Sequence, residues 1–161
     1  MAEAMTPAGG FAGRRRVLVV CKGNTCRSPA AAAVITELSG GTLDVRSAGT
    51  HARPVGGPAS PLMVEAMAAA GYDLSGHRST LLDTALVDWA DDLVAADEET
   101  ARAVAALAGP GRAVRLLGSG IPDPWGGDVA EYARAVRRIQ QAAREYCATR
   151  ERGADDGRPS G

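Results

Sequence analysis

Short apolar runs alternate with helix-like segments along most of this chain. The strand-like runs, which are rich in valine, leucine and alanine, lie at residues 16–20, 43–49, 92–96 and 113–117. The helix-like segments lie at residues 29–38, 60–71, 83–90, 97–108 and 129–150. Strands that alternate with helices form a parallel sheet covered by helices. We therefore expect an α/β fold, a single three-layer domain with a four-stranded parallel sheet and helices on both faces.

The composition is that of one folded domain. A chain of 161 residues, of which 45% are hydrophobic, can bury a sizeable core. We expect the domain to cover residues 14–150, with flexible tails at residues 1–13 and 151–161. The formal net charge of −1, from 18 basic and 19 acidic residues, argues against nucleic acid as a partner.

The sequence has no feature of a secreted or membrane protein. No apolar stretch is long enough to span a membrane, and the first residues lack the pattern of a signal peptide. Three cysteines are too few for a disulfide framework. We expect a cytoplasmic monomer without a membrane partner, whose thiols stay reduced and available for chemistry.

The segment CKGNTCRSP, residues 21–29, lies where the first strand ends and a helix begins. Ligands bind at the carboxyl ends of the strands in such folds. A zinc site needs about four ligands, and only Cys21 and Cys26 cluster here. A nucleotide-binding loop ends in Gly-Lys-Ser/Thr, whereas this segment ends in Cys-Arg-Ser. Two structural cysteines would leave Asn24 and Arg27 unexplained. We expect neither a metal nor a cofactor.

A phosphate-binding loop accounts for the whole segment. Backbone N–H groups that enter a helix N-terminus converge on a tetrahedral oxyanion. We expect the phosphate to be bound by Lys22, Gly23, Asn24, Thr25, Cys26 and Arg27. The same positive field favours a thiolate at Cys21, and the planar fork of Arg27 can hold two phosphoryl oxygens. Attack of a thiolate on phosphorus gives a phosphocysteine intermediate.

Four further residues are expected to support this chemistry. Gly23 permits a close backbone approach or a positive φ, and Asn24 tolerates a left-handed conformation and can tie the loop together. Ser28 can cap the helix and donate its hydroxyl toward the thiolate. Asp123 lies between two prolines that stiffen its turn, where it can protonate a leaving group and then deprotonate water.

The segments CKGNTCRSP and DPW, residues 123–125, resemble the low-molecular-weight protein tyrosine phosphatases. Members of this family share the pattern C-x-G-N-x-C-R-S-P and an Asp-Pro-aromatic motif, and the resemblance covers roughly residues 15–148. It implies that Cys21 is the nucleophile, that Arg27 binds phosphate and steadies the transition state, and that Asp123 is the general acid. Asn24 and Ser28 then organise the loop.

The resemblance also implies roles for the remaining cysteines and a histidine. Cys26 is similar to the family's neighbouring cysteine, which can form a reversible disulfide with the nucleophile and protect it from overoxidation. His77 matches a family histidine that we expect to be structural. Cys147 lies on the last helix, where we expect it to pack.

The resemblance leaves several substrates open, a phosphorylated protein or a small phosphate ester. Phosphotyrosine in proteins is favoured, with Thr25, Arg53 and Trp125 lining the substrate pocket. The protein arginine phosphatases of the same family also carry a threonine in the loop and an Asp-Pro-aromatic-Gly-Gly run. Arsenate reduction would need a further pair of cysteines in a mobile segment. A non-catalytic anion binder would need neither Cys21 nor Asp123.

Overall fold

The computed structural model describes residues 13–52 and 54–156, with side chains up to residue 150. The expected N-terminal tail lies outside the described residues except for Gly13. No helix in the described ranges combines the length and the apolar character that crossing a membrane requires.

Four parallel strands form one sheet, which confirms the predicted α/β fold. The strands are β1 (Arg15–Cys21), β2 (Leu43–Gly49), β3 (Asp92–Ala95) and β4 (Val114–Leu116). They are ordered β2-β1-β3-β4, so the chain crosses to one side of β1 for β2 and to the other side for β3. The point at which the strand order reverses, beyond the carboxyl end of β1, is where ligands bind in open α/β sheets.

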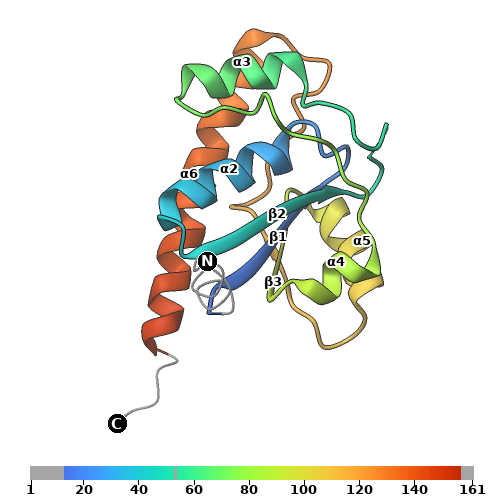
Figure 1. Ribbon diagram of the computed structural model, residues 1–161, viewed down its shortest axis with the longest axis vertical. Coiled ribbons are helices and arrows are strands. Elements are labelled where there is room, and N and C mark those ends of the chain that lie inside the picture. Colours follow the sequence, from blue (N-terminus) through green and yellow to red (C-terminus); the bar gives the residue numbers. More distant parts are fainter. Residues whose placement is uncertain (1–12, 53, 157–161) are drawn as a thin grey trace, which may run out of the picture.

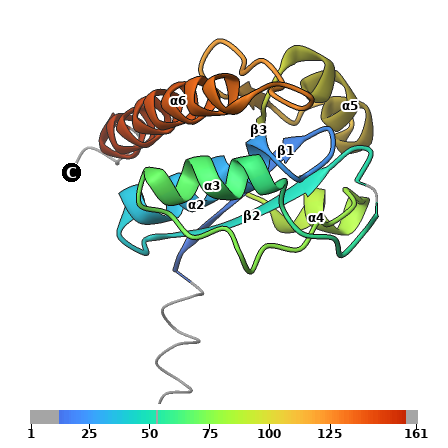
Figure 2. The ribbon, with the colours of Figure 1, turned by 90° about the horizontal axis from the view of Figure 1, so that it is seen from above.

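Helices cover both faces of the sheet, as the alternation predicts. They are α2 (Arg27–Ser39), α3 (Pro61–Ala69), α4 (Thr84–Trp89), α5 (Glu98–Ala108) and α6 (Val129–Asp156). Figures 1 and 2 show α2 and α6 side by side on one face and α4 and α5 on the other. The result is the expected three-layer domain.

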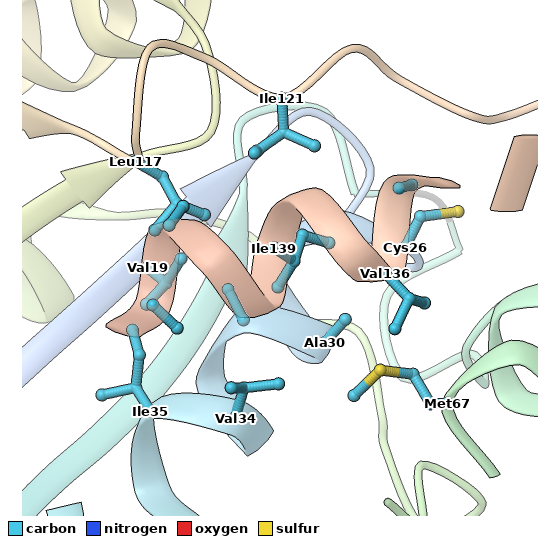
Figure 3. Packing of buried hydrophobic residues seen from close by; sticks show 14 of the residues in the cluster. Val19, Cys26, Ala30, Val34, Ile35, Met67, Leu117, Ile121, Val136 and Ile139 are labelled. Carbon is cyan, nitrogen blue, oxygen red and sulfur yellow. The ribbon is translucent and has the colours of Figure 1, made fainter. Parts of the chain in front are cut away.

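The central strand β1 is buried on both faces and fixes the end of the phosphate loop. Val17 and Val19 face the α2 and α6 layer, and Leu18 and Val20 face the α4 and α5 layer. All four are completely buried. Figure 3 shows Val19 of β1 and Ile139 of α6 in the same cluster of buried side chains. Burial of each such side chain contributes about 1.5–3 kcal/mol, which makes β1 a rigid base for the loop that follows it.

Two helix boundaries differ from the sequence prediction. Helix α2 begins at Arg27 rather than at residue 29, so Ser28 lies within its first turn and does not cap it. Helix α6 continues to Asp156 and thus includes residues 151–156, which the sequence assigned to the tail. Its first residue Val129 is 63% exposed, because the buried side of the helix begins about one turn later, at Tyr132.

Candidate functional site

The phosphate loop, residues 21–28, joins the end of β1 to the first turn of α2. A cavity of about 240 Å³ opens over it. The cavity is lined by Cys21, Lys22, Gly23, Thr25, Cys26, Arg27, His51, Asp123 and Trp125. The fold thereby brings the phosphate loop together with a second loop, residues 118–128, which we call the acid loop.

The Cys21 thiol lies at the floor of the cavity and receives two hydrogen-bond contacts. Its Sγ is 3.0 Å from Ser28 Oγ, and the backbone N–H of Asn24 donates to it over 3.2 Å. The residue is only 2% exposed. An amide donor, a hydroxyl and the N-terminus of α2 all favour negative charge on this sulfur. The hydroxyl that the sequence suggested as a helix cap therefore serves the sulfur.

Asn24 holds the phosphate loop in shape from behind the cavity. Its φ of 56° is the only positive value at a non-glycine residue in the described chain. Its Nδ2 donates to Ser28 Oγ (2.7 Å) and to Ser47 Oγ (3.0 Å), while its Oδ1 accepts from the Thr80 N–H (2.8 Å). These bonds fix a left-handed conformation that asparagine tolerates better than most residues. Asn24 does not line the cavity, although the sequence placed it among the phosphate-binding residues.

His77 completes the support of Asn24, in the structural position that was expected for it. Its Nε2 lies 2.7 Å from the Asn24 carbonyl oxygen, which it reaches as a donor. Burial lowers the pKa of His77. A neutral imidazole with its proton on Nε2 is enough for this bond.

The glycine on which the backbone of the phosphate loop packs most closely is Gly49. Gly23 has no positive φ, and a Cβ there would meet only Thr25 Oγ1 at 3.5 Å. A Cβ at Gly49 would lie 2.7 Å from the Lys22 carbonyl oxygen and 2.9 Å from the Asn24 nitrogen. The sequence could not indicate this, because the close approach arises from the pairing of Cys21 with Gly49 between β1 and β2.

Arg27 lines the cavity, and hydrogen bonds to Asp97 and Ile121 fix the position of its guanidinium. Its Nη1 donates to Asp97 Oδ2 (2.7 Å) and to the Ile121 carbonyl (2.9 Å), and the side chain is 2% exposed. Its Nε is buried without a partner. Burial alone would lower the pKa of Arg27, but the bond to Asp97 and the nearby charges of Cys21 and Asp123 raise it. The guanidinium keeps its charge for an anion.

Asp97 is a site residue that the sequence analysis missed. It was read only as an acid at the start of a helix, and its Oδ1 does accept from the Thr100 N–H (2.8 Å). Burial opposes the charge of this carboxylate, but its bonds to Arg27 and Thr100 lower its pKa overall. Its place just beyond the carboxyl end of β3 was the available signal.

Asp123 lies at the mouth of the cavity. Its Oδ2 is 3.6 Å from Arg27 Nη2, its Oδ1 accepts from the Trp125 N–H (3.1 Å), and its side chain is 43% exposed. The Trp125 side chain is 74% exposed and lines the cavity beside it. A carboxyl group so placed faces both a bound phosphoryl group and solvent, which is the geometry that general acid–base catalysis needs.

Cys26 is buried and joined to α6. Its Sγ lies 3.7 Å from the Tyr132 hydroxyl and 3.8 Å from Thr25 Oγ1. Ser60 Oγ donates to the Tyr132 hydroxyl (3.2 Å), and the Ser60 N–H donates to the Thr25 carbonyl (2.9 Å). Burial raises the pKa of Cys26, so this thiol stays neutral beside Cys21. The sequence placed Tyr132 in the last helix-like segment and indicated no contact with Cys26.

Arg53, expected in the substrate pocket, lies outside the described residues. Cys147 of α6 is half-buried against the larger core, as expected. In the described ranges, no group of three His, Cys, Asp or Glu side chains is arranged to hold a metal ion.

Comparisons with known proteins agree with this geometry. Residues 16–154 match the family model of the low molecular weight phosphotyrosine protein phosphatases. EpsP of Ralstonia nicotianae, a probable low molecular weight protein-tyrosine-phosphatase, is 36% identical over 132 residues, which are 79% of this chain and 90% of EpsP.

Solved structures resemble the chain over most of its length. Vibrio vulnificus Wzb in complex with benzylphosphonate is 29% identical with a TM-score of 0.80, over 85% of this chain and 99% of Wzb. The arginine phosphatase YwlE of Bacillus subtilis, solved as a cysteine-to-serine variant with a phosphorylated active-site serine, is 31% identical with a TM-score of 0.76. That similarity covers 83% of this chain and 94% of YwlE.

Proposed function

The chain belongs to the low molecular weight phosphotyrosine protein phosphatase family, and from this premise we propose that it dephosphorylates phosphotyrosine in proteins. It is a cysteine-dependent phosphoric monoester hydrolase. The observation that carries the proposal is that Cys21, Arg27, Asp123 and Trp125 line one and the same cavity. A nucleophile, a phosphate-binding guanidinium, an acid and an aromatic wall converge there.

In the first step the phosphoryl group lies on the phosphate loop, between its backbone N–H groups and the Arg27 guanidinium. The Cys21 thiolate attacks phosphorus. The new S–P bond forms as the P–O bond to the leaving group breaks, and Asp123 gives its proton to the leaving oxygen. Ser28 and the Asn24 N–H stabilise the thiolate before attack.

In the second step water hydrolyses the phosphocysteine. The Asp123 carboxylate takes a proton from the water as its oxygen bonds to phosphorus. The S–P bond breaks, inorganic phosphate leaves, and the Cys21 thiolate returns. A covalent intermediate of this kind is consistent with YwlE, whose serine variant carries a phosphorylated active-site serine.

Phosphotyrosine is preferred over phosphoarginine because of the exposed ring at the cavity mouth. Trp125 can stack on a phenyl ring, and Wzb binds an aromatic phosphonate. The alternative is supported by Thr25 and the run DPWGG, and by the similarity to YwlE. A guanidinium can also stack on tryptophan, so the substrates must be compared directly.

The test is a comparison of kcat/KM on matched peptides that carry phosphotyrosine or phosphoarginine, together with a small aliphatic phosphate ester. We expect the phosphotyrosine peptide to be hydrolysed fastest, without added metal and with inhibition by orthovanadate. A clear preference for phosphoarginine would move the chain to the arginine branch, and a preference for the small ester would overturn the protein substrate.

We also propose that Cys26 protects the nucleophile. Peroxide would oxidise the Cys21 thiolate to a sulfenic acid, which the Cys26 thiol converts to a disulfide with loss of water. Both thiols are free in this structure. A thiolate nucleophile needs a reducing compartment, which supports the cytoplasm, and a site built from one chain supports a monomer.

A further inference from the structure

Two exposed basic side chains, Lys22 and His51, line the phosphate cavity. Both also line a second hollow of about 200 Å³. The residues that line this second hollow are Lys22, Arg27, Thr50, His51, Asp97, Glu99, Thr100, Ala103 and Asp123. Because four residues are common to both hollows, the two are adjacent. A group next to the phosphorylated residue of a substrate can reach the second hollow.

The loop after β2 holds His51 in register with the nucleophile. The Thr50 N–H donates to the Cys21 carbonyl (3.0 Å), and the His51 N–H donates to the Lys22 carbonyl (2.8 Å). Nδ1 of the imidazole lies 2.8 Å from Thr50 Oγ1, which leaves Nε2 for another partner. The ring is therefore held by the same strand end that presents the sulfur.

Some of the polar and charged groups around the two hollows have partners, and others do not. Arg27 is paired with Asp97 and lies 3.6 Å from Asp123. In the described part of the chain, Lys22 and Nε2 of His51 have no hydrogen-bonding or ionic partner. Among the acids that line the two hollows, Glu99 alone has no hydrogen-bonding or ionic partner within the described residues. It lines only the second hollow. The Lys22 ammonium, which lines the phosphate cavity, therefore has no acidic partner from this part of the chain.

We propose that Lys22 and His51 form a basic rim that selects a second negative charge, a carboxylate next to the phosphorylated residue of the substrate. This proposal rests on the proposed function. The Lys22 ammonium donates a charge-assisted hydrogen bond to the carboxylate, and Nε2 of His51 donates a second hydrogen bond to it.

The experiment uses three phosphotyrosine peptides that differ only in one flanking residue, Glu, Gln or Lys. The ratio of kcat/KM for the Glu and Gln peptides is measured at one neutral pH. Ionisation of the phosphoryl group and of the catalytic residues affects both peptides, so the ratio isolates the rim. We expect a preference for Glu of about two- to fivefold, as for partly exposed ion pairs.

Variants test whether the preference for the Glu peptide comes from Lys22 and His51. In Lys22→Gln with His51→Gln the ratio should fall to about one. Glu98→Gln is the matched control, because Glu98 is exposed, pairs with Arg102 and lines neither hollow. Its ratio should equal that of the wild type.

Three results would overturn the rim. They are a ratio of one in the wild type, an unchanged ratio in the double variant, and a preference for the Lys peptide, which would assign the hollow to Glu99. If all three peptides are inert while 4-nitrophenyl phosphate is hydrolysed, the proposed protein substrate fails instead. In that case the rim is tested with small aryl phosphates. The ratio of kcat/KM for an ester with a ring carboxylate to that for the ester without it then takes the place of the peptide ratio.

Discussion

At the scale of single residues, Cys21 and Asp123, our proposed nucleophile and acid, differ in their surroundings. The sulfur is 2% exposed and receives its contacts from the phosphate loop itself. The carboxyl group is 43% exposed and comes from the acid loop, which follows β4 in the chain. Residue types and short spacing were enough to propose both roles. The distance between the carboxylate and the Arg27 guanidinium was not available from the sequence.

We predict that Cys21→Ser abolishes turnover, by about 10³-fold or more, because a serine hydroxyl is a far weaker nucleophile toward phosphorus than a thiolate. Phosphate should still bind, since the loop and Arg27 are retained. Hydrolysis of a phosphotyrosine peptide and calorimetric binding of phosphate measure the two effects. Cys147→Ser should stay within about twofold of wild-type activity, because Cys147 packs on α6 away from the cavity. Full activity of Cys21→Ser would refute the mechanism.

We predict that Asp123→Asn slows hydrolysis of phenyl phosphate by about 10²–10⁴-fold, because the poor leaving group needs a proton. The loss should be much smaller with 4-nitrophenyl phosphate, whose leaving group departs as the anion. Asp128→Asn is the control on the same loop, since its side chain only caps the start of α6. Equal losses on both esters would remove Asp123 from the role of general acid.

At the scale of elements, the phosphate loop depends on β2 as much as on β1. Cys21 pairs with Gly49, and the loop backbone passes directly over that glycine. Helix α2 also starts two residues earlier than predicted, at Arg27, so that Ser28 faces the sulfur from within the first turn. The periodicity of the sequence locates such elements but does not reveal which of their ends touch.

We predict that Gly49→Ala destabilises the protein by about 1–3 kcal/mol and lowers kcat/KM by about 10–100-fold. The new methyl group would lie 2.7 Å from the Lys22 carbonyl oxygen and would displace the loop. Chemical denaturation and peptide hydrolysis measure the two effects. Gly76→Ala should change neither, because nothing lies within 4 Å of a Cβ there. A fully active Gly49→Ala would show that the loop tolerates the shift.

At the scale of the whole molecule, Asp97 ties the reaction centre to the stability of the fold. It caps α5 from beyond β3 and also holds Arg27, which begins α2 on the opposite face of the sheet. The lowered pKa of Asp97 means that its contribution is fully present above the unfolded value of about 4. That contribution is lost as the pH falls through the lower folded value.

We predict that Asp97→Asn lowers the free energy of unfolding by about 1–2 kcal/mol at pH 7, the range for a partly exposed charged hydrogen bond. The difference from wild type should start to shrink below about pH 4, where the carboxyl group of the unfolded chain becomes protonated, and should vanish as the pH falls through the lower folded pKa of Asp97. Denaturation at a series of pH values from 7 down to about 2.5 measures it. Asp83→Asn is the control, because Asp83 caps α4 in the same way without an arginine partner. A difference that stays unchanged over this whole range would contradict the charge-based account.

The α/β class, the place of Cys21 at the end of the first strand, and the choice of Cys21, Arg27 and Asp123 as catalytic candidates all came from the sequence. These depend on short-range periodicity, and on a loop whose residue types make sense only around a phosphate. The tertiary structure decided the rest: Gly49 beneath the loop, Asp97 behind Arg27, Tyr132 against Cys26, and His51 at the rim. Each of these depends on strand register and on helix packing between residues far apart in the chain, which local spacing does not encode.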